Sequence, residues 1–391
     1  MEGSPEPIRS CAERSGGEGA RNPRRAGWIV TISAAGRAEA ARIAAQFAAA
    51  GALPVETAIL QPADTLLDLY GEDIRARAYV TADPLAGEMM LRPDFTVPVV
   101  QMHMESQAEP ARYTYSGEVF RKQESDERRP HEFLQVGYEV FDGKAPAQAD
   151  AEVFAVIAKA LDGLPLRAAT GDFGILMAAV GGLATSEARK AALMRHLWRP
   201  RRFRALLERF GGKVAPPASR AALLSADEPF KGAGAEFGLR SRDEVEQRIE
   251  ALRKDAALPP ISGEEISLLD MILSLRETAQ NVLANLRDIA VDMPAIVSAV
   301  DRLEERLDAL AARGVDVTTL EFEGSYGRTS MEYYDGFVFG FYAEQRPDLP
   351  PVATGGRYDA LTRVLGQGRA VPAVGAVIRP EVIVSLGEGA A

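Results

Sequence analysis

Apolar and polar residues alternate in ways that divide the start of the chain into predicted elements. Residues 36–50 are rich in alanine and place Ile43 and Phe47 on one stripe, and Gly51 follows where a left-handed cap would end a helix. Residues 54–60 alternate in the manner of a strand. The pattern predicts a helix, a turn and a strand.

Four further segments have the period-two or β-rich character of strands, and short polar segments separate them. They cover residues 88–92, 112–116, 118–123 and 132–141. A helix over 148–161 would then pack on one face of the sheet. Its packing residues would be Val153, Phe154, Ile157 and Leu161. This order predicts an antiparallel sheet.

Beyond Asp172 the pattern is helical as far as about residue 314, with proline and glycine interruptions. We expect residues 173–314 to form a mostly helical insert. Its last helix would begin at a cap, Asp292, and repeat apolar residues at spacings of three and four. Those residues are Ile296, Val300, Leu303, Leu307 and Leu310. Core packing is the favoured interpretation of this stripe, and a seam for a partner helix is the alternative.

Strands return after the helical stretch, over residues 317–322 and 335–342. The second strand alternates aromatic residues on one face, and its glycines leave room for close approach on the other. The aromatic residues are Phe337, Phe339 and Phe341. Thr354-Gly-Gly-Arg-Tyr-Asp predicts a glycine turn before a short helix, and residues 371–378 predict a last strand.

Composition is typical of a folded protein. Of 391 residues, 47% are apolar and 26% are charged, close to the average for globular proteins. Residues 1–26 predict a disordered tail, and residues 27–391 the domain. A twin-arginine export signal at Arg24-Arg25 is the less favoured alternative, because the apolar stretch after it is short. No apolar run approaches the roughly 20 residues that span a bilayer, so we expect a cytoplasmic protein without membrane contact.

Cysteine, histidine and net charge exclude several kinds of site. Cys11 is the single cysteine, which excludes an internal disulfide and a thiolate metal site and fits a reducing compartment. His103, His131 and His196 lack metal-ligand spacing, so we predict no metal and expect core or surface histidines. The formal charge of −11 argues against nucleic-acid binding.

Basic residues nevertheless gather in two places. The clusters are Arg128-Arg129 and the group Arg199, Arg201, Arg202 and Arg204. A solvated helix face is the favoured interpretation of the second cluster, and phosphate contacts are the alternative.

Two neighbouring strands carry charged and amide side chains between their apolar positions. If 118–123 and 132–141 are antiparallel neighbours, Arg121 leans toward the space above the sheet, and Gln135 and Glu139 project from one face. A guanidinium suits a phosphate or carboxylate, and an amide with a carboxylate suits an ammonium or an imidazole N–H. A solvated sheet face is the alternative.

Five short motifs occur in one order along the chain. They are Leu91-Arg92-Pro93-Asp94-Phe95-Thr96, Phe120-Arg121 followed by Gln135 and Glu139, Glu332-Tyr333-Tyr334, Thr354-Gly-Gly-Arg-Tyr-Asp, and Pro372-Ala-Val-Gly. In this order they resemble the catalytic domain of histidyl-tRNA synthetase, a class II synthetase, over about residues 35–387 apart from the helical stretch. The resemblance implies an α+β fold, with an antiparallel sheet flanked by helices and a helical insert, and a dimer.

The resemblance also implies a histidine pocket. Its residues would be Asp94, Thr96, Arg121, Gln135, Glu139, Tyr333 and Tyr334. The acids, the amide and the threonine would meet the ammonium, and the paired tyrosines would border the imidazole. The arginine would hold the α-phosphate or the substrate carboxylate. These roles fit the chemistry, because acids and amides satisfy a buried cation and rings enclose a planar one.

Residues that the synthetases use for ATP are missing at the matching positions. The glutamate that holds the adenine amine is replaced by Gln123, and two arginines fall on Thr329 and Val382. Arg328 is one residue away from the first of these and would point to the opposite face of a strand. Losing two of three guanidiniums should remove on the order of several kcal/mol of transition-state stabilisation. We therefore predict no catalytic residue.

Nine residues follow Val382, too few for an anticodon-binding domain, and the acidic balance agrees with its absence. With Leu-Arg-Pro-Asp-Phe-Thr in place of the synthetases' Glu-Gly-Thr form, the chain resembles the regulatory subunit of ATP phosphoribosyltransferase. This resemblance implies a non-catalytic chain, without cofactor, that binds and activates the short-form catalytic subunit in the first step of L-histidine biosynthesis. It implies a homodimer within a hetero-oligomer, with L-histidine as a further expected ligand.

The transfer reaction itself is not expected here. Thr170-Gly171 and Thr354-Gly355 lack the acidic pair of a phosphoribosyl-pyrophosphate loop, and turns are predicted at both. The alternatives are an active histidyl-tRNA synthetase-like enzyme, a ligase that activates an amino acid for another amine, and a binding module with an unrelated partner.

Overall fold

The computed structural model describes residues 32–64, 77–106, 108–123, 130–234, 238–328 and 333–388. Within them the strands are β1 (Leu53–Pro54), β2 (Leu60–Pro62), β3 (Val80–Asp83), β4 (Gly87–Leu91), β5 (Ala111–Phe120), β6 (Glu132–Phe141), β7 (Arg167–Asp172), β8 (Arg276–Thr278), β9 (Glu321–Glu323), β10 (Phe337–Tyr342), β11 (Ala353–Arg357) and β12 (Ala373–Ile378). The helices are α1 (Ala34–Ala49), α4 (Thr96–Ser106), α5 (Pro146–Ala160), α6 (Phe173–Gly182), α7 (Glu187–Met194), α8 (Pro200–Phe210), α9 (Ala218–Ser225), α10 (Arg242–Ala257), α11 (Gly263–Ser274), α12 (Ala279–Asp292), η2 (Pro294–Ile296), α13 (Val297–Ala312), α14 (Asp359–Leu365) and α15 (Pro380–Glu388).

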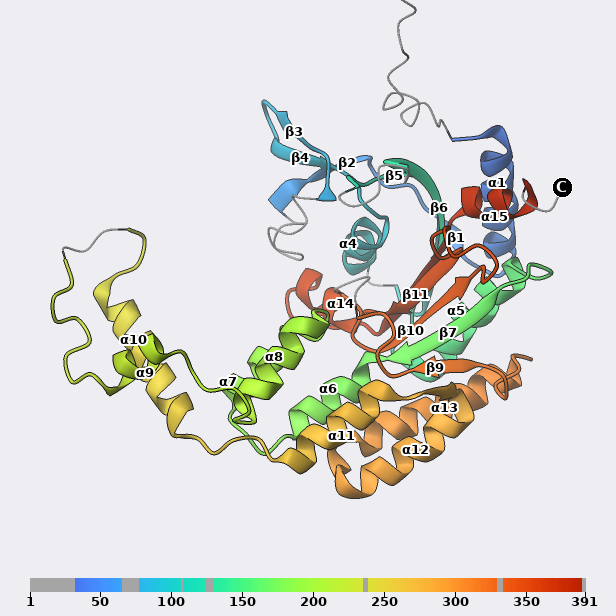
Figure 1. Cartoon of the computed structure of the whole chain (residues 1–391). Helices are drawn as coiled ribbons and strands as arrows, with labels where there is room; N and C mark the ends of the chain where they lie inside the picture. The colour runs from blue at the N-terminus through green and yellow to red at the C-terminus, as the bar shows by residue number, and fades with distance from the viewer. Residues whose placement is uncertain are drawn as a thin grey trace, which may run out of the picture.

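One large mixed sheet organises the described chain. Its strand order is β1-β5-β6-β12-β11-β10-β7-β9-β8, and a small second sheet has the order β2-β4-β3. Neighbours are antiparallel except for the parallel pairs β1/β5 and β7/β9. Because segments far apart in the sequence alternate across this sheet, the residues before and after the helical stretch share one scaffold (Figure 1). The predicted α+β class is confirmed.

Helices cover one face of the sheet through apolar side chains. Helices α1 and α5 pack Ile43, Phe47 and Phe154 onto it. The predicted aromatic face of β10 is confirmed, because Phe339 and Phe341 lie 5.1 and 5.3 Å from the Phe154 ring. The other face carries α4 and α14, which pack on it through a second apolar cluster (Figure 1).

A buried ion network joins the sheet to the helical stretch. Asp150 on α5 accepts from Arg306 Nε on α13 at 2.8 Å and from Arg357 Nη2 on β11 at 2.6 Å. Arg306 also pairs with Asp172 at 2.9 Å. Burial lowers the pKa of Arg357, but the carboxylates of Asp150 and Asp359 outweigh burial, and the pKa is raised. Helix α13 is therefore fixed to the body by charge as well as by apolar packing.

Several predicted elements are confirmed closely. The helix predicted at 36–50 is α1, and Gly51 has the expected positive φ of 95°. The strand predicted at 132–141 is β6. The stripe on the last long helix is buried, which confirms core packing rather than a partner seam. Its start was wrong, because Asp292 ends α12, and Pro294 opens a short η2 before α13 begins at Val297.

The predicted break between 112–116 and 118–123 is wrong, because β5 is continuous. Gly117 lies within it, paired with Gln135. A Cβ on Gly117 would lie 2.7 Å from Arg92 Nη2, so the glycine serves close packing rather than a turn.

The predicted turns at Thr354-Gly355 and Thr170-Gly171 are also wrong, because these residues lie in β11 and β7. A Cβ on Gly355 would lie 2.5 Å from the Ala376 Cβ, and one on Gly171 would lie 2.8 Å from the Tyr326 Cβ. Both glycines allow neighbouring atoms to approach the sheet.

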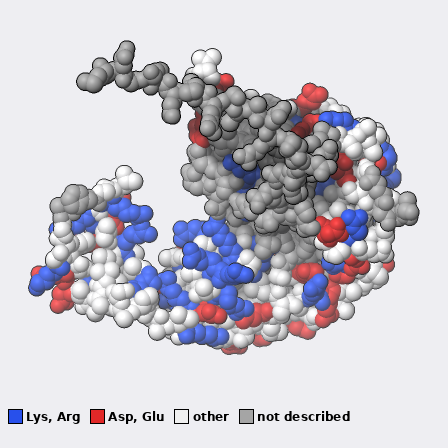
Figure 2. Space-filling model, turned by 45° about the horizontal axis from the view of Figure 1, so that its top comes forward, with Lys and Arg blue, Asp and Glu red and all other residues white. Residues whose placement is uncertain are grey.

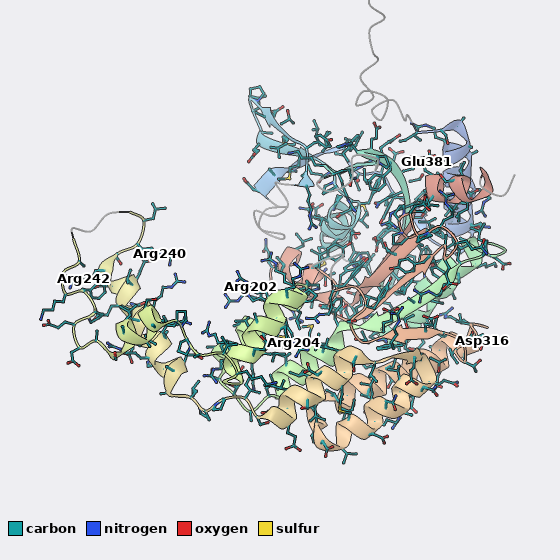
Figure 3. The ribbon with its side chains drawn as sticks, viewed as in Figure 1. Arg202, Arg204, Arg240, Arg242, Asp316 and Glu381 are labelled. Atoms are coloured by element: carbon teal, nitrogen blue, oxygen red, sulfur yellow. The ribbon has the colours of Figure 1, made fainter. Side chains whose placement is uncertain are left out.

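Two predicted strands are shorter than expected. Of residues 54–60 only the ends pair, because the chain crosses there from the large sheet to the small one. Of residues 317–322 only the last two join β9. Asp316 instead accepts hydrogen bonds from the Thr318 backbone N–H at 3.0 Å and its hydroxyl at 2.6 Å, which closes a local turn (Figure 3).

The helical stretch divides into two packing environments. Helices α6, α11, α12 and α13 contribute to the main core, and β8 is a short strand within the stretch. In contrast, α9 buries no residue and α10 buries only Ile249. These two helices form an arm that projects from the body (Figure 1). The boundaries 173 and 314 and the tail 1–26 remain predictions, and the tail lies outside the described residues.

Among the described helices, none has the length and apolar character needed to cross a bilayer.

Candidate functional site

The seven residues predicted to form a pocket line a single cavity. It is bounded by Asp94, Thr96, Arg121, Gln135, Glu139, Tyr333 and Tyr334, together with Tyr358 and the segment Gly375–Val377. The space in it that a water molecule can occupy amounts to only about 10 Å³. The side chains therefore nearly fill the cavity, and an amino acid can enter only if they move.

Five structural segments bring these side chains together. Asp94 and Thr96 stand at the start of α4, and Arg121 directly follows β5. Gln135 and Glu139 lie on β6, and the β6/β12 register sets Glu139 opposite Gly375. The paired tyrosines precede β10, and Tyr358 precedes α14. The period of two along β6 aims both polar side chains at the same face.

Glu139 is the hydrogen-bonding centre of the cavity. Its carboxylate accepts from the hydroxyls of Tyr358 at 2.6 Å, Tyr115 at 2.8 Å and Thr96 at 3.3 Å. The side chain is only 1% exposed. The glycine at 375 makes room for it, because a Cβ there would overlap Glu139 Oε2.

Burial raises the pKa of Glu139 to about 7. The three hydroxyl donors oppose this shift, and the nearby Asp94 charge adds to it. The carboxyl is consequently balanced between its neutral and charged forms near neutral pH. A cation placed in the cavity would favour the charged form.

A buried amide and a guanidinium flank this centre. Gln135 is 1% exposed, and its Oε1 accepts no hydrogen bond from the described residues. Arg121 donates from Nε to the Pro93 carbonyl at 2.7 Å, which fixes the position of the guanidinium. The cavity thus offers acceptors at its floor and a cation at its edge, a combination that suits a zwitterion.

Aromatic rings form the remaining wall. The rings of Tyr333 and Tyr334 lie 4.7 Å apart, and Tyr333 meets Tyr358 edge to face at 6.1 Å. Burial, followed by the Glu139 charge, raises the pKa of Tyr334, so this tyrosine is a neutral hydroxyl in the pocket. Flat rings of this kind enclose a planar group.

Sequence reasoning missed three contributors to this site. Tyr358 lies inside the Thr354-Gly-Gly-Arg-Tyr-Asp motif, and Tyr115 lies on the strand that ends beside Arg121, so each had a usable signal. Arg379 had none. Its Nη1 donates to the Pro351 carbonyl at 2.7 Å, and its Nη2 lies 3.4 Å from Thr354 Oγ1. Burial, and then the Arg121 charge, lowers the pKa of Arg379 to about 10, so two cations lie near each other.

The positions where the synthetases' arginines were missing carry no cation into the cavity. Val382 is buried in the apolar core. Arg328 points away from the cavity, as predicted, although it lies in a turn rather than a strand. Its Nε donates to the Leu197 carbonyl at 2.7 Å, and its guanidinium lies 4.8 Å from the Phe203 ring. Thr329 lies outside the described residues. Gln123 donates to the Pro130 carbonyl at 2.9 Å.

Histidines and acids form no metal cluster within the described residues. His103 is a core residue, as expected, because it stacks on Phe141 at 3.8 Å and hydrogen-bonds Tyr113 at 3.2 Å. Burial, and then the Arg369 charge, lowers the pKa of His103 to about 4, so the ring is neutral.

Comparison with solved structures supports the fold. The chain resembles an ATP phosphoribosyltransferase regulatory subunit/histidyl-tRNA synthetase from Bacillus halodurans, with a TM-score of 0.64 and 22% identity over 90% of this chain and 79% of the other. It resembles histidyl-tRNA synthetase from Nostoc with a TM-score of 0.61 and 17% identity, covering 92% and 73% of the two chains. The class II synthetase-like fold is thereby confirmed.

Sequence comparison is more specific. The histidyl-tRNA synthetase family profile matches residues 33–258 and 239–383. ATP phosphoribosyltransferase regulatory subunits from Allorhizobium ampelinum and Mesorhizobium japonicum are 32% and 31% identical to this chain. The first alignment covers 84% of this chain and 92% of the relative, and the second covers 90% and 98%. The chain therefore belongs to the ATP phosphoribosyltransferase regulatory-subunit family, a branch with the histidyl-tRNA synthetase fold.

Proposed function

We propose that this chain binds and activates the short-form catalytic subunit of ATP phosphoribosyltransferase, the first enzyme of L-histidine biosynthesis, and that its cavity senses L-histidine. The names of relatives that match almost the whole chain support the regulatory role. We further propose a homodimer within a hetero-oligomer, in the cytoplasm.

The observation that carries histidine sensing is the arrangement of acceptors and cation in one cavity. Glu139 and the unsatisfied Gln135 oxygen would accept from the ammonium or the imidazole N–H. Arg121 at the edge would hold the carboxylate, and the paired tyrosines would enclose the ring. A buried acceptor without a donor costs free energy, so a ligand N–H that reaches Gln135 stabilises the bound state.

The small open volume supports a regulatory role, because ligand binding would require a second form of the cavity. Since about 10 Å³ admits one water-sized sphere at most, histidine would bind a rearranged form of the cavity. If the catalytic subunit also distinguishes these two forms, histidine and the partner affect each other's affinity equally.

We also propose that synthetase chemistry is lost. Beyond the absent cations, the sheet face next to the cavity is covered by the chain's own side chains. Tyr326 lies over Gly171 and Gly340: a Cβ on Gly171 would lie 2.8 Å from the Tyr326 Cβ, and one on Gly340 would overlap the Tyr326 hydroxyl. The Tyr326 hydroxyl also hydrogen-bonds the Tyr342 hydroxyl at 2.8 Å. A nucleotide would have to displace this pair.

One observation favours the alternative of an amino-acid-activating enzyme. Arg379 lies near Arg121 and could replace a missing arginine as a phosphate ligand. Its hydrogen bonds to Pro351 and Thr354 hold it to the protein itself, which is why we prefer a regulatory role.

The decisive experiment mixes the chain with a short-form catalytic subunit and measures phosphoribosyl-ATP formation with and without histidine. We expect activation by the chain and inhibition by histidine. Glu139→Ala should weaken the histidine response while the complex stays intact. Unchanged inhibition would place feedback sensing elsewhere, and histidine-dependent pyrophosphate exchange into ATP would support the alternative.

A further inference from the structure

The helices α7 and α8 carry a charge opposite to that of the whole chain. Residues 187–213 contain nine Lys or Arg and two Glu, an excess of seven positive charges, whereas the formal charge of the whole chain is −11. Figure 2 shows Lys and Arg side chains gathered in the middle of one face and, across a hollow, on the arm. Such segregation produces a local positive field despite the acidic total.

Part of this charge is neutralised within the chain. Arg189 and Arg209 share Asp255 at 2.6 and 3.4 Å, and Arg204 pairs with Asp270 at 2.7 Å. These pairs join α7, α8, α10 and α11 and are structural.

Another part has no carboxylate partner among the described residues. This group, which we call the basic face, consists of Arg195, Arg201, Arg202, Arg240 and Arg242. All five are exposed. Figure 3 shows Arg202 on α8 and Arg240 and Arg242 at the start of α10, on the two sides of the hollow.

The arginines of this region also affect a neighbouring histidine. Burial, followed by the positive charges of Arg199, Arg202 and Arg195, lowers the pKa of His196. Cations that lie close together repel one another, so a partner that brings negative charge to them lowers the free energy of the complex.

The arm and the chain that leads into it also expose apolar side chains. Leu239 is fully exposed beside Arg240, Val214 is 50% exposed, and Leu223 on α9 is 37% exposed. The Arg242 guanidinium stacks on Phe230 at 4.6 Å, which presents a flat, partly apolar surface. Arginine mixed with apolar residues is typical of protein interfaces, whereas phosphate backbones use the cations and not exposed leucines.

We propose that the basic face and the apolar side chains of the arm form the docking surface for an acidic face of a protein partner. This inference depends on the proposed function, in which that partner is the short-form catalytic subunit. The cavity lies on different elements, so docking and histidine sensing can be altered separately.

Binding of the full chain to a short-form catalytic subunit, measured by calorimetry at increasing NaCl, tests this surface. The wild-type affinity should fall at least about tenfold between low and high salt, because exposed charges are screened. The double variant Arg201→Glu, Arg202→Glu should bind about 10 to 100 times more weakly at low salt and lose most of the salt dependence. Leu239→Ser should weaken binding about threefold to tenfold at every salt concentration.

The matched control is Lys144→Glu with Lys159→Glu, which makes the same charge change at two exposed positions, one just before α5 and one near its end. Its affinity should stay within about twofold of wild type. Histidine binding to the isolated chain should be equal in all variants. If the charge-reversal variant unfolds, Arg201→Gln with Arg202→Gln replaces it, with a smaller expected loss.

Equal affinity of the α8 variant and the control overturns this inference and leaves the proposed function intact. Failure of the wild type to bind any short-form catalytic subunit overturns both. A double-stranded RNA hairpin is the second probe. If the wild type binds it at about 150 mM salt, the α8 variant does not, and catalytic-subunit binding is unchanged, the face is a nucleic-acid site and the inference is wrong.

Discussion

The body and the arm of this chain differ in whether their charged side chains are buried and paired or exposed to solvent. In the body, Asp150, Arg306 and Arg357 are almost fully buried and satisfy one another, and Glu139 is enclosed by three hydroxyl donors. On α8 and the arm, arginines without a carboxylate partner among the described residues face solvent beside exposed leucines. A buried charge must be paired or hydrogen-bonded by groups of its own chain, since burial removes its hydration. An exposed charge keeps its hydration and can still pair with another molecule.

The largest effect that separates the two regions is expected at the buried network. Asp150→Ala leaves Arg306 and Arg357 without their shared carboxylate, so the free energy of unfolding should fall by about 3–5 kcal/mol in chemical denaturation. Asp308→Ala, at an exposed position on the same helix as Arg306, is the control and should change it by less than about 0.5 kcal/mol. Similar values for the two variants would mean that the network does not stabilise the fold.

A methyl group at the cavity floor should have the next largest effect. Gly375→Ala places a Cβ on the Glu139 carboxylate, so we expect a loss of about 1–3 kcal/mol in stability and at least a tenfold loss in histidine affinity. Gly181→Ala is the matched control, because no atom lies within 4 Å of its added Cβ and alanine favours the helix. Histidine affinity that survives Gly375→Ala would place the ligand outside this cavity.

The pH dependence of stability should identify Glu139. Its pKa is about 7 in the folded chain and 4.5 ordinarily, so the folded state binds the proton more tightly. The resulting stabilisation is complete below pH 4.5 and is lost as the pH rises through 7. Relative to Glu139→Gln, the wild type should lose about 2 kcal/mol of unfolding free energy between pH 5 and 8.

Histidine binding should show the opposite trend, because an ammonium favours the charged carboxylate. Its affinity should rise by up to about fourfold from pH 6.5 to 8 in the wild type, as the ionised fraction of Glu139 increases, and stay flat in Glu139→Gln, as measured by calorimetry. A parallel rise in both proteins would assign the titration to another group.

The smallest effect is expected on the arm side. Arg202→Ala should change the unfolding free energy by less than about 0.5 kcal/mol, because Arg202 is exposed and has no ion pair with the described residues, and such an arginine contributes little to stability. A loss above about 1 kcal/mol would mean that the basic face is structural rather than available to a partner.

Much of the site could be predicted because its residues sit in short motifs with fixed spacing. Gln135 and Glu139 share a face because strands have a period of two, and all seven predicted residues meet in one cavity. The predicted strand break at Gly117 and the predicted turn at Gly355 were wrong, because a glycine in sequence does not say whether it serves a turn or close packing. That distinction depends on which distant atoms lie above it.

The sequence by itself determined the order of elements, the polar residues of the cavity and the excess of arginine on α8, since each depends on local spacing or composition. Only the tertiary structure decided that Tyr358, 219 positions away, donates to Glu139, that burial raises the pKa of this glutamate, and that Arg379 lies near Arg121. Burial and hydrogen bonding depend on segments that meet only after folding, and no local pattern encodes their distance.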